Sequence, residues 1–390
     1  MKTVLKKGAA ILLALALLLP AGIFPAAATY LLGDVNRDGF IGADDARLAL
    51  RMSVELEKAG AAETACGDAD GDGSLTAIDA RLILRCSVGL TGFGGKKVTV
   101  SDPSSGPAPA DPVLTVPAAP AVNAPHGTFT FVKYGNGHGV GMSQYGAIGM
   151  ADAGYTYKQI LTHYYANSKV VRAASWPSAT WYAGSHIDTE ELLARIVYQE
   201  ISGATQNPEA LKAQAVAVFT LLKRDGFRVT SPGSVGYAGP SYAACSAVLK
   251  KAVRECVGEY MAMANDSACK PILTVYSAMV AGRTVNCSDA WGGDYPVSVD
   301  SPYDATFPNF ISFYTITTST LRDYIRDYSS SITLSSDPAD WLEILSHNAS
   351  LDAGRGYVTK IRVGDRVLTG AQFKSLLDLS TGCFTVVYTP

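Results

Sequence analysis

An internal repeat between residues 33 and 90 constrains the fold of this chain more than any other feature. The segment GDVNRDG at 33–39 returns as GDADGDG at 67–73, and both copies continue with the pattern DARLxLR, at 45–51 and 79–85. Matching residues are 34 positions apart throughout. Self-similarity at a fixed offset predicts one supersecondary unit formed twice, here a polar loop followed by a helix.

Oxygen-bearing side chains recur in each copy at the spacing of a calcium-binding loop. In such a loop positions 1, 3, 5 and 12 supply side-chain oxygens, position 7 supplies its carbonyl, and a glycine at position 6 allows the sharp turn. Gly39 and Gly73 hold position 6, which favours metal loops over a pair of acidic surface turns. The predicted ligands of two Ca²⁺ ions are Asp34, Asn36, Asp38, Phe40 and Asp45 in the first copy and Asp68, Asp70, Asp72, Ser74 and Asp79 in the second.

The repeat resembles a type I dockerin domain, because no amphipathic helix precedes the first loop and position 12 is Asp rather than Glu. The resemblance covers residues 30–92 and implies a small all-α, calcium-binding domain that attaches to a cohesin module of a scaffoldin. The cohesin-binding residues it implies are Ala43, Asp44 and Arg47 in the first copy and Ala77, Ile78 and Arg81 in the second. The difference between Asp44 and Ile78 argues against two equivalent binding modes. A module of this size has a thin core, so bound calcium should supply much of its folding energy.

The start of the chain is typical of an exported protein. Lys2, Lys6 and Lys7 precede an uncharged apolar run at 9–19, which is too short to span a bilayer comfortably, and three alanines at 26–28 suit a signal peptidase. We therefore expect a signal peptide at 1–28, with an uncleaved anchor as the alternative. The mature protein is expected to be secreted and extracellular, associated with a cellulosome or the cell surface, without a transmembrane anchor.

Composition narrows the remaining possibilities. The 32 basic and 35 acidic residues nearly balance, so charge gives no reason to propose a nucleic acid as partner. The seven cysteines are an odd number, so at least one lies outside any disulfide within the chain. Seven prolines between 103 and 125 predict that residues 93–126 form an extended linker.

Residues 127–390 are expected to form a larger domain built around a glycine-rich segment. Glycines at 135, 137, 139 and 141 leave a backbone with little side-chain cover, which lets another molecule approach closely. His138, Ser143, Gln144 and Tyr145 lie on or beside this segment and can exchange hydrogen bonds with a ligand. We interpret the segment as one wall of a binding site.

Periodicity predicts an α+β domain with mixed helices and antiparallel strands. The expected strands are 128–133, 271–276 and 384–388, and the expected helices are 143–154, 157–165, 188–198, one starting at 208, and 371–377. Glu200 follows an apolar turn and precedes the alanine-rich helix at 208. A carboxyl group against apolar surface can stay protonated and act as a general acid, although a glutamate at a helix end is usually just solvated.

Three segments together resemble the SpoIID/LytB family of bacterial cell-wall proteins: residues 137–165, residue 200 with 209–217, and 276–304. The resemblance implies a lytic transglycosylase that acts on peptidoglycan glycan strands. Glu200 would protonate the glycosidic oxygen after N-acetylmuramic acid and then take the proton of that sugar's 6-hydroxyl, closing a 1,6-anhydro ring. The substrate contacts assigned with it are His138, Ser143, Gln144, Tyr145, Gln214 and Ser277.

The order of these segments is unusual for the family. The Gly-His-Gly segment comes first here, and residues 356–390 look like what the family places just before it. A circular permutation explains this order and predicts that the strand at 384–388 lies beside the strand at 128–133. Some family members bind zinc through a His and two Cys. No His stands between 186 and 347, so zinc is not expected in this domain.

Other functions fit parts of the sequence. A noncatalytic wall-binding or amidase-enhancing module would use the same groove. A cellulosomal polysaccharide hydrolase would need a second carboxylate, and the candidates are Asp188, Glu190, Glu191, Glu209 and Asp289. A Cys-His protease stays open, although the five cysteines beyond residue 200 suit disulfides better. A serine hydrolase and a nucleotide-binding loop do not fit the spacing.

Overall fold

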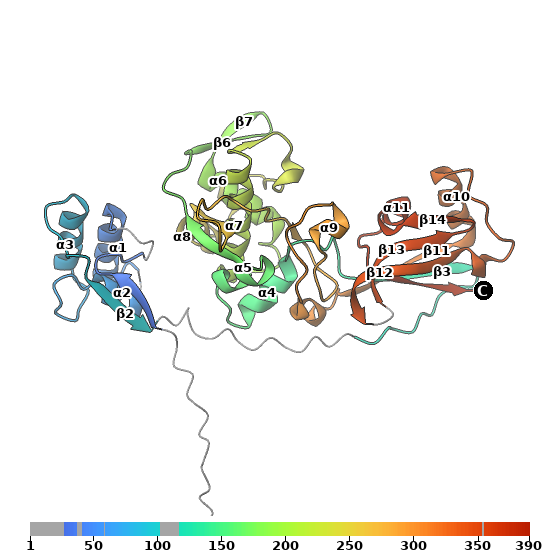
Figure 1. Ribbon diagram of the computed structural model, residues 1–390, viewed down its shortest axis with the longest axis horizontal. Coiled ribbons are helices and arrows are strands. Elements are labelled where there is room, and N and C mark those ends of the chain that lie inside the picture. The colour runs from blue at the N-terminus through green and yellow to red at the C-terminus, as the bar shows by residue number, and fades with distance from the viewer. Residues whose placement is uncertain (1–26, 37–40, 58, 102–116, 353–354) are drawn as a thin grey trace, which may run out of the picture. The chain divides into compact units, whose positions relative to one another are not determined.

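The chain forms two compact units, divided between Ala108 and Pro109 (Figure 1). The computed structural model describes residues 27–36, 41–57, 59–101, 117–352 and 355–390. The expected signal peptide lies outside the described residues except for Ala27 and Ala28, and so does the middle of the expected linker. Within the described part, no helix combines the length and apolar character needed to cross a membrane.

The small unit contains the two copies of the repeat and a short sheet. Its elements in the described residues are β1 (Ala27–Leu31), α1 (Ala43–Ser53), α2 (Ala61–Gly67), α3 (Ala77–Ser87) and β2 (Lys97–Ser101). Helices α1 and α3 follow the two loops, as the repeat predicts. The unit is not all-α, because β1 and β2 pair in antiparallel fashion. The sequence analysis did not predict this pairing. β1 overlaps the end of the expected signal peptide, β2 lies in the expected linker, and no hairpin turn joins two strands so far apart in the sequence.

The large unit has a helical part around α7 (Pro208–Arg224), twelve of whose seventeen residues are buried. Asn207 caps this helix and Pro208 starts it, as the sequence predicts. The surrounding helices are α4 (Gln144–Asp152), α5 (Tyr157–Tyr164), α6 (Thr189–Glu200) and α8 (Ala247–Cys256). The strands beside them are β5 (Ser168–Arg172), β6 (Ala179–Tyr182), β7 (Ser185–Asp188), β8 (Arg228–Val229) and β9 (Glu259–Met263).

The other part of the large unit is built on two antiparallel sheets. The first has the order β11 (Ile311–Thr317), β3 (Thr128–Tyr134), β15 (Phe384–Thr389), and the second has the order β12 (Leu342–Asp352), β13 (Arg355–Val363), β14 (Arg366–Thr369). Helices α10 (Thr318–Tyr328) and α11 (Gly370–Leu376) contribute to the same core. That core combines aliphatic side chains with five buried aromatic ones, Phe129, Phe131, Trp341, Phe373 and Phe384. The mixture of helices and mainly antiparallel strands confirms the α+β class of the large unit.

Strands β3 and β15 are neighbours, which confirms the prediction drawn from the unusual segment order. Their register runs from Phe384 opposite Lys133 to Thr389 opposite Thr128, and the N–H of Gly127 donates to the carbonyl of Thr389 at 2.8 Å. Figure 1 shows β3, which comes early in the large unit, lying among the last strands of the chain. The start and the end of the large unit are therefore in direct contact.

Two expectations about this unit are corrected. Of the predicted strand 271–276, only its end forms a ladder, as β10 (Tyr276–Ser277) parallel to β4 (Met142–Ser143). Ile272 and Thr274 are buried, as the alternation predicts. Pairing with β9 is limited to an isolated bridge between Pro271 and Ala262 and the hydrogen bond from the N–H of Ile272 to the carbonyl of Met261 at 3.0 Å. The five cysteines of the large unit are free thiols in this structure, so the disulfides expected there are not formed.

Candidate active site and calcium loop

The glycine-rich loop between β3 and β4 packs against another segment of the chain. Its four glycines all have positive φ, from 71° to 112°. A Cβ on Gly141 would lie 1.9 Å from the carbonyl oxygen of Val275, and one on Gly135 would lie 2.8 Å from that of Met279. The close approach of the segment at 275–281 thus requires glycine at 135, 137 and 141, and the ring of Tyr357 requires it at 139.

Two predicted substrate contacts hold this packing together. Ser143 is fully buried, caps α4 through the N–H of Gly146 at 3.1 Å, and donates to Asp304 Oδ1 at 2.5 Å. Ser277 is buried as well, and its Oγ accepts from the N–H of Gly139 at 3.1 Å. Both hydroxyls are buried in this packing, and their role as substrate contacts stays a prediction.

Glu200 lies where three helices meet. It is the last residue of α6, and its Oε2 accepts a hydrogen bond from Nε2 of Gln144 in the first turn of α4 at 3.0 Å. The same amide nitrogen is 3.5 Å from Oε1 of Gln214, which is fully buried on α7. The backbone N–H of Tyr237 also donates to the carboxyl. The structure therefore brings together Glu200, Gln144 and Gln214, which the sequence proposed from separate segments.

Burial controls the electrostatics of this carboxyl. Partial burial raises the pKa of Glu200 above its usual value, and the hydrogen bonds from Gln144 and Tyr237 oppose that rise without cancelling it. Burial and the neighbouring Glu200 hold the pKa of Tyr276 far above its usual range, so this hydroxyl stays protonated. A half-buried carboxyl among neutral amides and phenols can keep its proton and give it to a bound molecule.

A short loop at 235–238, which the sequence analysis did not single out, closes over Glu200. Gly236 has φ +113°, and a Cβ there would lie 3.0 Å from Glu200 Oε1. The hydroxyl of Tyr182 donates to the carbonyl of Gly236 and accepts from the N–H of Ala238, both at 2.9 Å. Glycines on both sides of Tyr237, at 236 and 239, were the available signal.

His138 and Tyr145 are the predicted contacts that reach the surface. The ring of Tyr145 is partly buried edge-on against Phe307, with centroids 4.9 Å apart. His138 is exposed and lies 4.9 Å from the ring of Trp291, just after α9 (Cys287–Ala290). Its imidazole also hydrogen bonds with the backbone of Tyr276, whose hydroxyl approaches Glu200. Contacts through His138 and Tyr276 thus connect the glycine-rich loop to the carboxyl of Glu200.

The candidates for a second carboxylate have other partners. Asp188, Glu190 and Glu191 lie at the start of α6, about 14 to 18 Å along the helix axis from Glu200 at 1.5 Å per residue. Glu209 accepts from the N–H of Tyr157 at 2.8 Å and pairs with Lys212. Asp289 accepts from Asn286 at 3.1 Å. The groups that shift the pKa of Glu200 among the described residues include no other acid.

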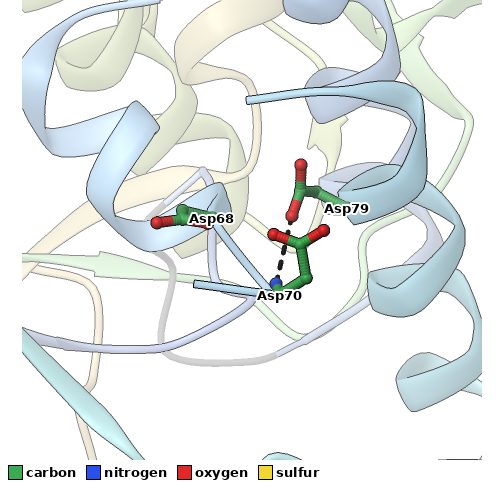
Figure 2. A group of neighbouring side chains, drawn as sticks. All are labelled: Asp68, Asp70 and Asp79. Atoms are coloured by element: carbon green, nitrogen blue, oxygen red, sulfur yellow. Dashed lines mark hydrogen bonds between the residues drawn. The ribbon is translucent and has the colours of Figure 1, made fainter. Parts of the chain in front are cut away.

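The second predicted calcium loop gathers its carboxylates. Oxygen atoms of Asp68, Asp70 and Asp79 lie within 4.8 Å of one another. Figure 2 shows these three side chains as neighbours. Oxygens bound to one Ca²⁺ at 2.3–2.6 Å are separated by up to about 5 Å, so this group fits the ion. Asp72 turns its Oδ1 to the N–H of Ser74 at 2.8 Å and is not part of the group.

The first loop has the same hydrogen bond as the second between the carboxylate at position 12 and the backbone N–H at position 3. Asp45 Oδ1 accepts from the N–H of Asn36 at 2.9 Å, as Asp79 Oδ1 accepts from that of Asp70 at 3.2 Å. Asp34 is buried like Asp45. The predicted ligands Asp38 and Phe40 lie outside the described residues. The six predicted cohesin-binding residues, Ala43, Asp44, Arg47, Ala77, Ile78 and Arg81, are all exposed on α1 and α3.

Comparison with known proteins gives one partial similarity. The chain is 48% identical over 52 residues to Stage II sporulation protein D of Bacillus amyloliquefaciens. The matched segment is 13% of this chain, and the chain spans 15% of the length of that protein. No protein-family model matches the chain. One region is therefore similar to Stage II sporulation protein D.

Proposed function

We propose that the large unit is a lytic transglycosylase that cleaves peptidoglycan glycan strands with Glu200 as general acid and base. The observation that carries this proposal is the isolation of Glu200: one half-buried carboxyl, its pKa raised by burial, held by neutral amides. The similarity of one region to Stage II sporulation protein D supports a cell-wall or sporulation-related role.

A single carboxyl suffices for this reaction. Glu200 protonates the glycosidic oxygen after N-acetylmuramic acid, and the bond from that oxygen to the anomeric carbon breaks. The carboxylate then removes the proton of the same sugar's 6-hydroxyl, whose oxygen bonds to the anomeric carbon and closes the anhydro ring. The N–H groups of Gln144 and Tyr237 stabilise the carboxylate between these steps. A hydrolase would need a second carboxylate about 5–9.5 Å from the first to act as nucleophile or to activate water.

The small unit is proposed to be a calcium-binding dockerin that attaches the secreted enzyme to a cohesin module of a scaffoldin. The carboxylates of Asp68, Asp70 and Asp79 support a bound Ca²⁺ in the second loop, with Asp72 and the carbonyl of Ser74 as its remaining proposed ligands. The corresponding hydrogen bond from the N–H of Asn36 to Asp45 in the first loop supports a second Ca²⁺ there. When bound, calcium would draw the acidic side chains of each loop together and stabilise the packing of α1 on α3.

The catalytic proposal is tested with Glu200→Gln, which keeps the size of the side chain but cannot donate or accept the proton. Glu191→Gln on the same helix is the matched control, because it removes a carboxyl far from the site. On peptide-free peptidoglycan, wild type and Glu191→Gln should release soluble fragments and Glu200→Gln should release none while still binding the glycan. Binding without fragments from the wild type would instead indicate a noncatalytic wall-binding module. Release that survives Glu200→Gln would refute the role of Glu200.

A further inference from the structure

Two large aromatic side chains are exposed beside the proposed active site. Tyr237 is 64% exposed and Trp291 is 53% exposed, the highest values for any Tyr and Trp among the exposed large hydrophobic residues described. Tyr237 contacts the catalytic carboxyl through its backbone, and Trp291 is connected to it through His138 and Tyr276. Large exposed aromatic surface at a site of chemistry indicates contact with a ligand.

The backbone that presents Tyr237 is held on both sides. The hydroxyl of Tyr182 bonds the residues immediately before and after it, Gly236 and Ala238, at 2.9 Å each. The hydroxyl of Tyr276 donates to the carbonyl of Val235 at 2.6 Å. The N–H of Tyr237 itself donates to Glu200. An exposed ring on a backbone fixed in this way is a preformed contact surface, so little entropy is lost when a ligand covers it.

Trp291 is fixed on the side of the glycine-rich loop. The backbone N–H of Trp291 donates to the carbonyl of Cys287 at 2.8 Å, and the indole ring lies against the ring of His138. His138 in turn accepts from the N–H of Val140 at 3.1 Å. His138 contacts the backbone of Tyr276, and the hydroxyl of Tyr276 and Oε1 of Glu200 both lie beside Gly236, so a chain of contacts connects the exposed indole to the carboxyl.

We propose that Tyr237 and Trp291 are stacking platforms for two different sugar rings of the glycan strand that Glu200 cleaves. This inference rests on the proposed function and names the residues that hold its substrate. The face of a pyranose ring that carries C–H bonds is apolar, while its hydroxyl groups point outward. An aromatic ring can cover that face and leave the hydroxyls in water or on polar neighbours such as His138.

The test uses the full chain with Glu200→Gln as background, so that the glycan is bound and not consumed. Peptide-free glycan strands are the probe. Tyr237→Ala and Trp291→Ala should each weaken binding about tenfold, as loss of a large aromatic contact does, whereas Tyr237→Phe should bind like the background. Tyr324→Ala is the matched control, because Tyr324 is a comparably exposed ring on α10. With Glu200 present, the alanine variants should raise KM about tenfold and change kcat little.

The outcomes separate this inference from the function on which it rests. If the Glu200→Gln chain binds glycan and neither alanine variant weakens binding, Tyr237 and Trp291 are not stacking platforms, while the catalytic proposal stands. If Tyr324→Ala weakens binding as much as the others, the effect is nonspecific and the platforms are again wrong. If the wild type neither binds nor cleaves glycan strands, both proposals fail.

Discussion

Burial and hydrogen bonding act in opposite directions on the carboxyl of Glu200. Burial raises its pKa and so keeps a proton available, while the donors Gln144 and Tyr237 stabilise the charged form that results when the proton is given away. A group that must alternate between acid and base benefits from both influences.

Removal of the Gln144 donor should therefore change the pH dependence of cleavage. Because Gln144 lowers the pKa of Glu200, Gln144→Leu should raise that pKa and move the decline of kcat/KM at increasing pH to a higher pH. Loss of a hydrogen bond to the carboxylate should also slow the reaction about ten- to a hundredfold. Gln199→Leu, at an exposed neighbouring glutamine, should leave the profile unchanged. An unchanged profile in Gln144→Leu would contradict this account.

Asp304 is a fully buried acid of the large unit. It accepts from the hydroxyls of Ser143 and Ser301 and from the N–H of Val280 at 3.0 Å. Burial raises its pKa to about 7, against the lowering effect of these donors. The carboxyl connects the cap of α4, the segment at 280 and the η4 turn (Pro302–Thr306), so it fixes the glycine-rich loop in place.

This raised pKa predicts a loss of stability at increasing pH. The folded state keeps the proton of Asp304 up to pH 7, whereas the unfolded chain releases it near pH 4, so the free energy of unfolding should fall between these values. The contribution is at most about 1.4 kcal/mol per pH unit. Asp304→Asn should remove it. Urea unfolding followed by tryptophan fluorescence measures this, since all four Trp residues belong to the large unit. Equal pH dependence in both proteins would contradict the assignment.

Some of the site could be predicted at the scale of single residues and some could not. Glu200, Gln144 and Gln214 carry groups whose chemistry is visible in the sequence, and the structure brings them together. Ser143 has the same apparent chemistry, yet its hydroxyl serves the helix cap and a buried acid. Tyr237 acquires its place from partners 55 and 39 residues away, at 182 and 276. Such long-range contacts leave no local pattern.

At the scale of elements, the helix starts expected near residues 143, 188 and 208 agree with the structure. Asp188, Asn207 and Ser143 cap the helices that begin after them, because side-chain acceptors for free N–H groups are chosen locally. The predicted strand 271–276 was wrong over most of its length. Alternation reports which side chains are buried, whereas a ladder depends on a neighbouring strand that the sequence does not specify.

The contact between β3 and β15 makes a specific rearrangement testable. A chain that begins at residue 167 and carries residues 126–166 after Pro390 would restore the segment order typical of the SpoIID/LytB resemblance. Because the N–H of Gly127 already bonds the carbonyl of Thr389, we expect this large unit to fold with an unfolding free energy within about 2 kcal/mol of the original. Urea titration measures it. A rearranged chain that fails to unfold cooperatively would contradict the inferred permutation.

At the scale of the whole molecule, the two units should respond differently to calcium. The hydrophobic cluster of the small unit rests on few large side chains, with Val35 and Ile83 among its buried members, while its loops concentrate carboxylates that repel one another without a cation. EDTA should therefore unfold the small unit, seen as loss of helical circular dichroism and rapid proteolysis of α1 and α3. The tryptophan fluorescence of the large unit should not change. A small unit that stays protected in EDTA would contradict calcium-dependent folding.

The chemistry at the ends of the released fragments tests the central claim most directly. Wild-type protein is incubated with peptide-free peptidoglycan, and the soluble products are examined by mass spectrometry. A transglycosylase that uses Glu200 alone should release strands ending in 1,6-anhydro-N-acetylmuramic acid, lighter by one water than hydrolytic products. Fragments with ordinary reducing ends would contradict the account, because they require water to attack the anomeric carbon in place of the sugar's own 6-hydroxyl.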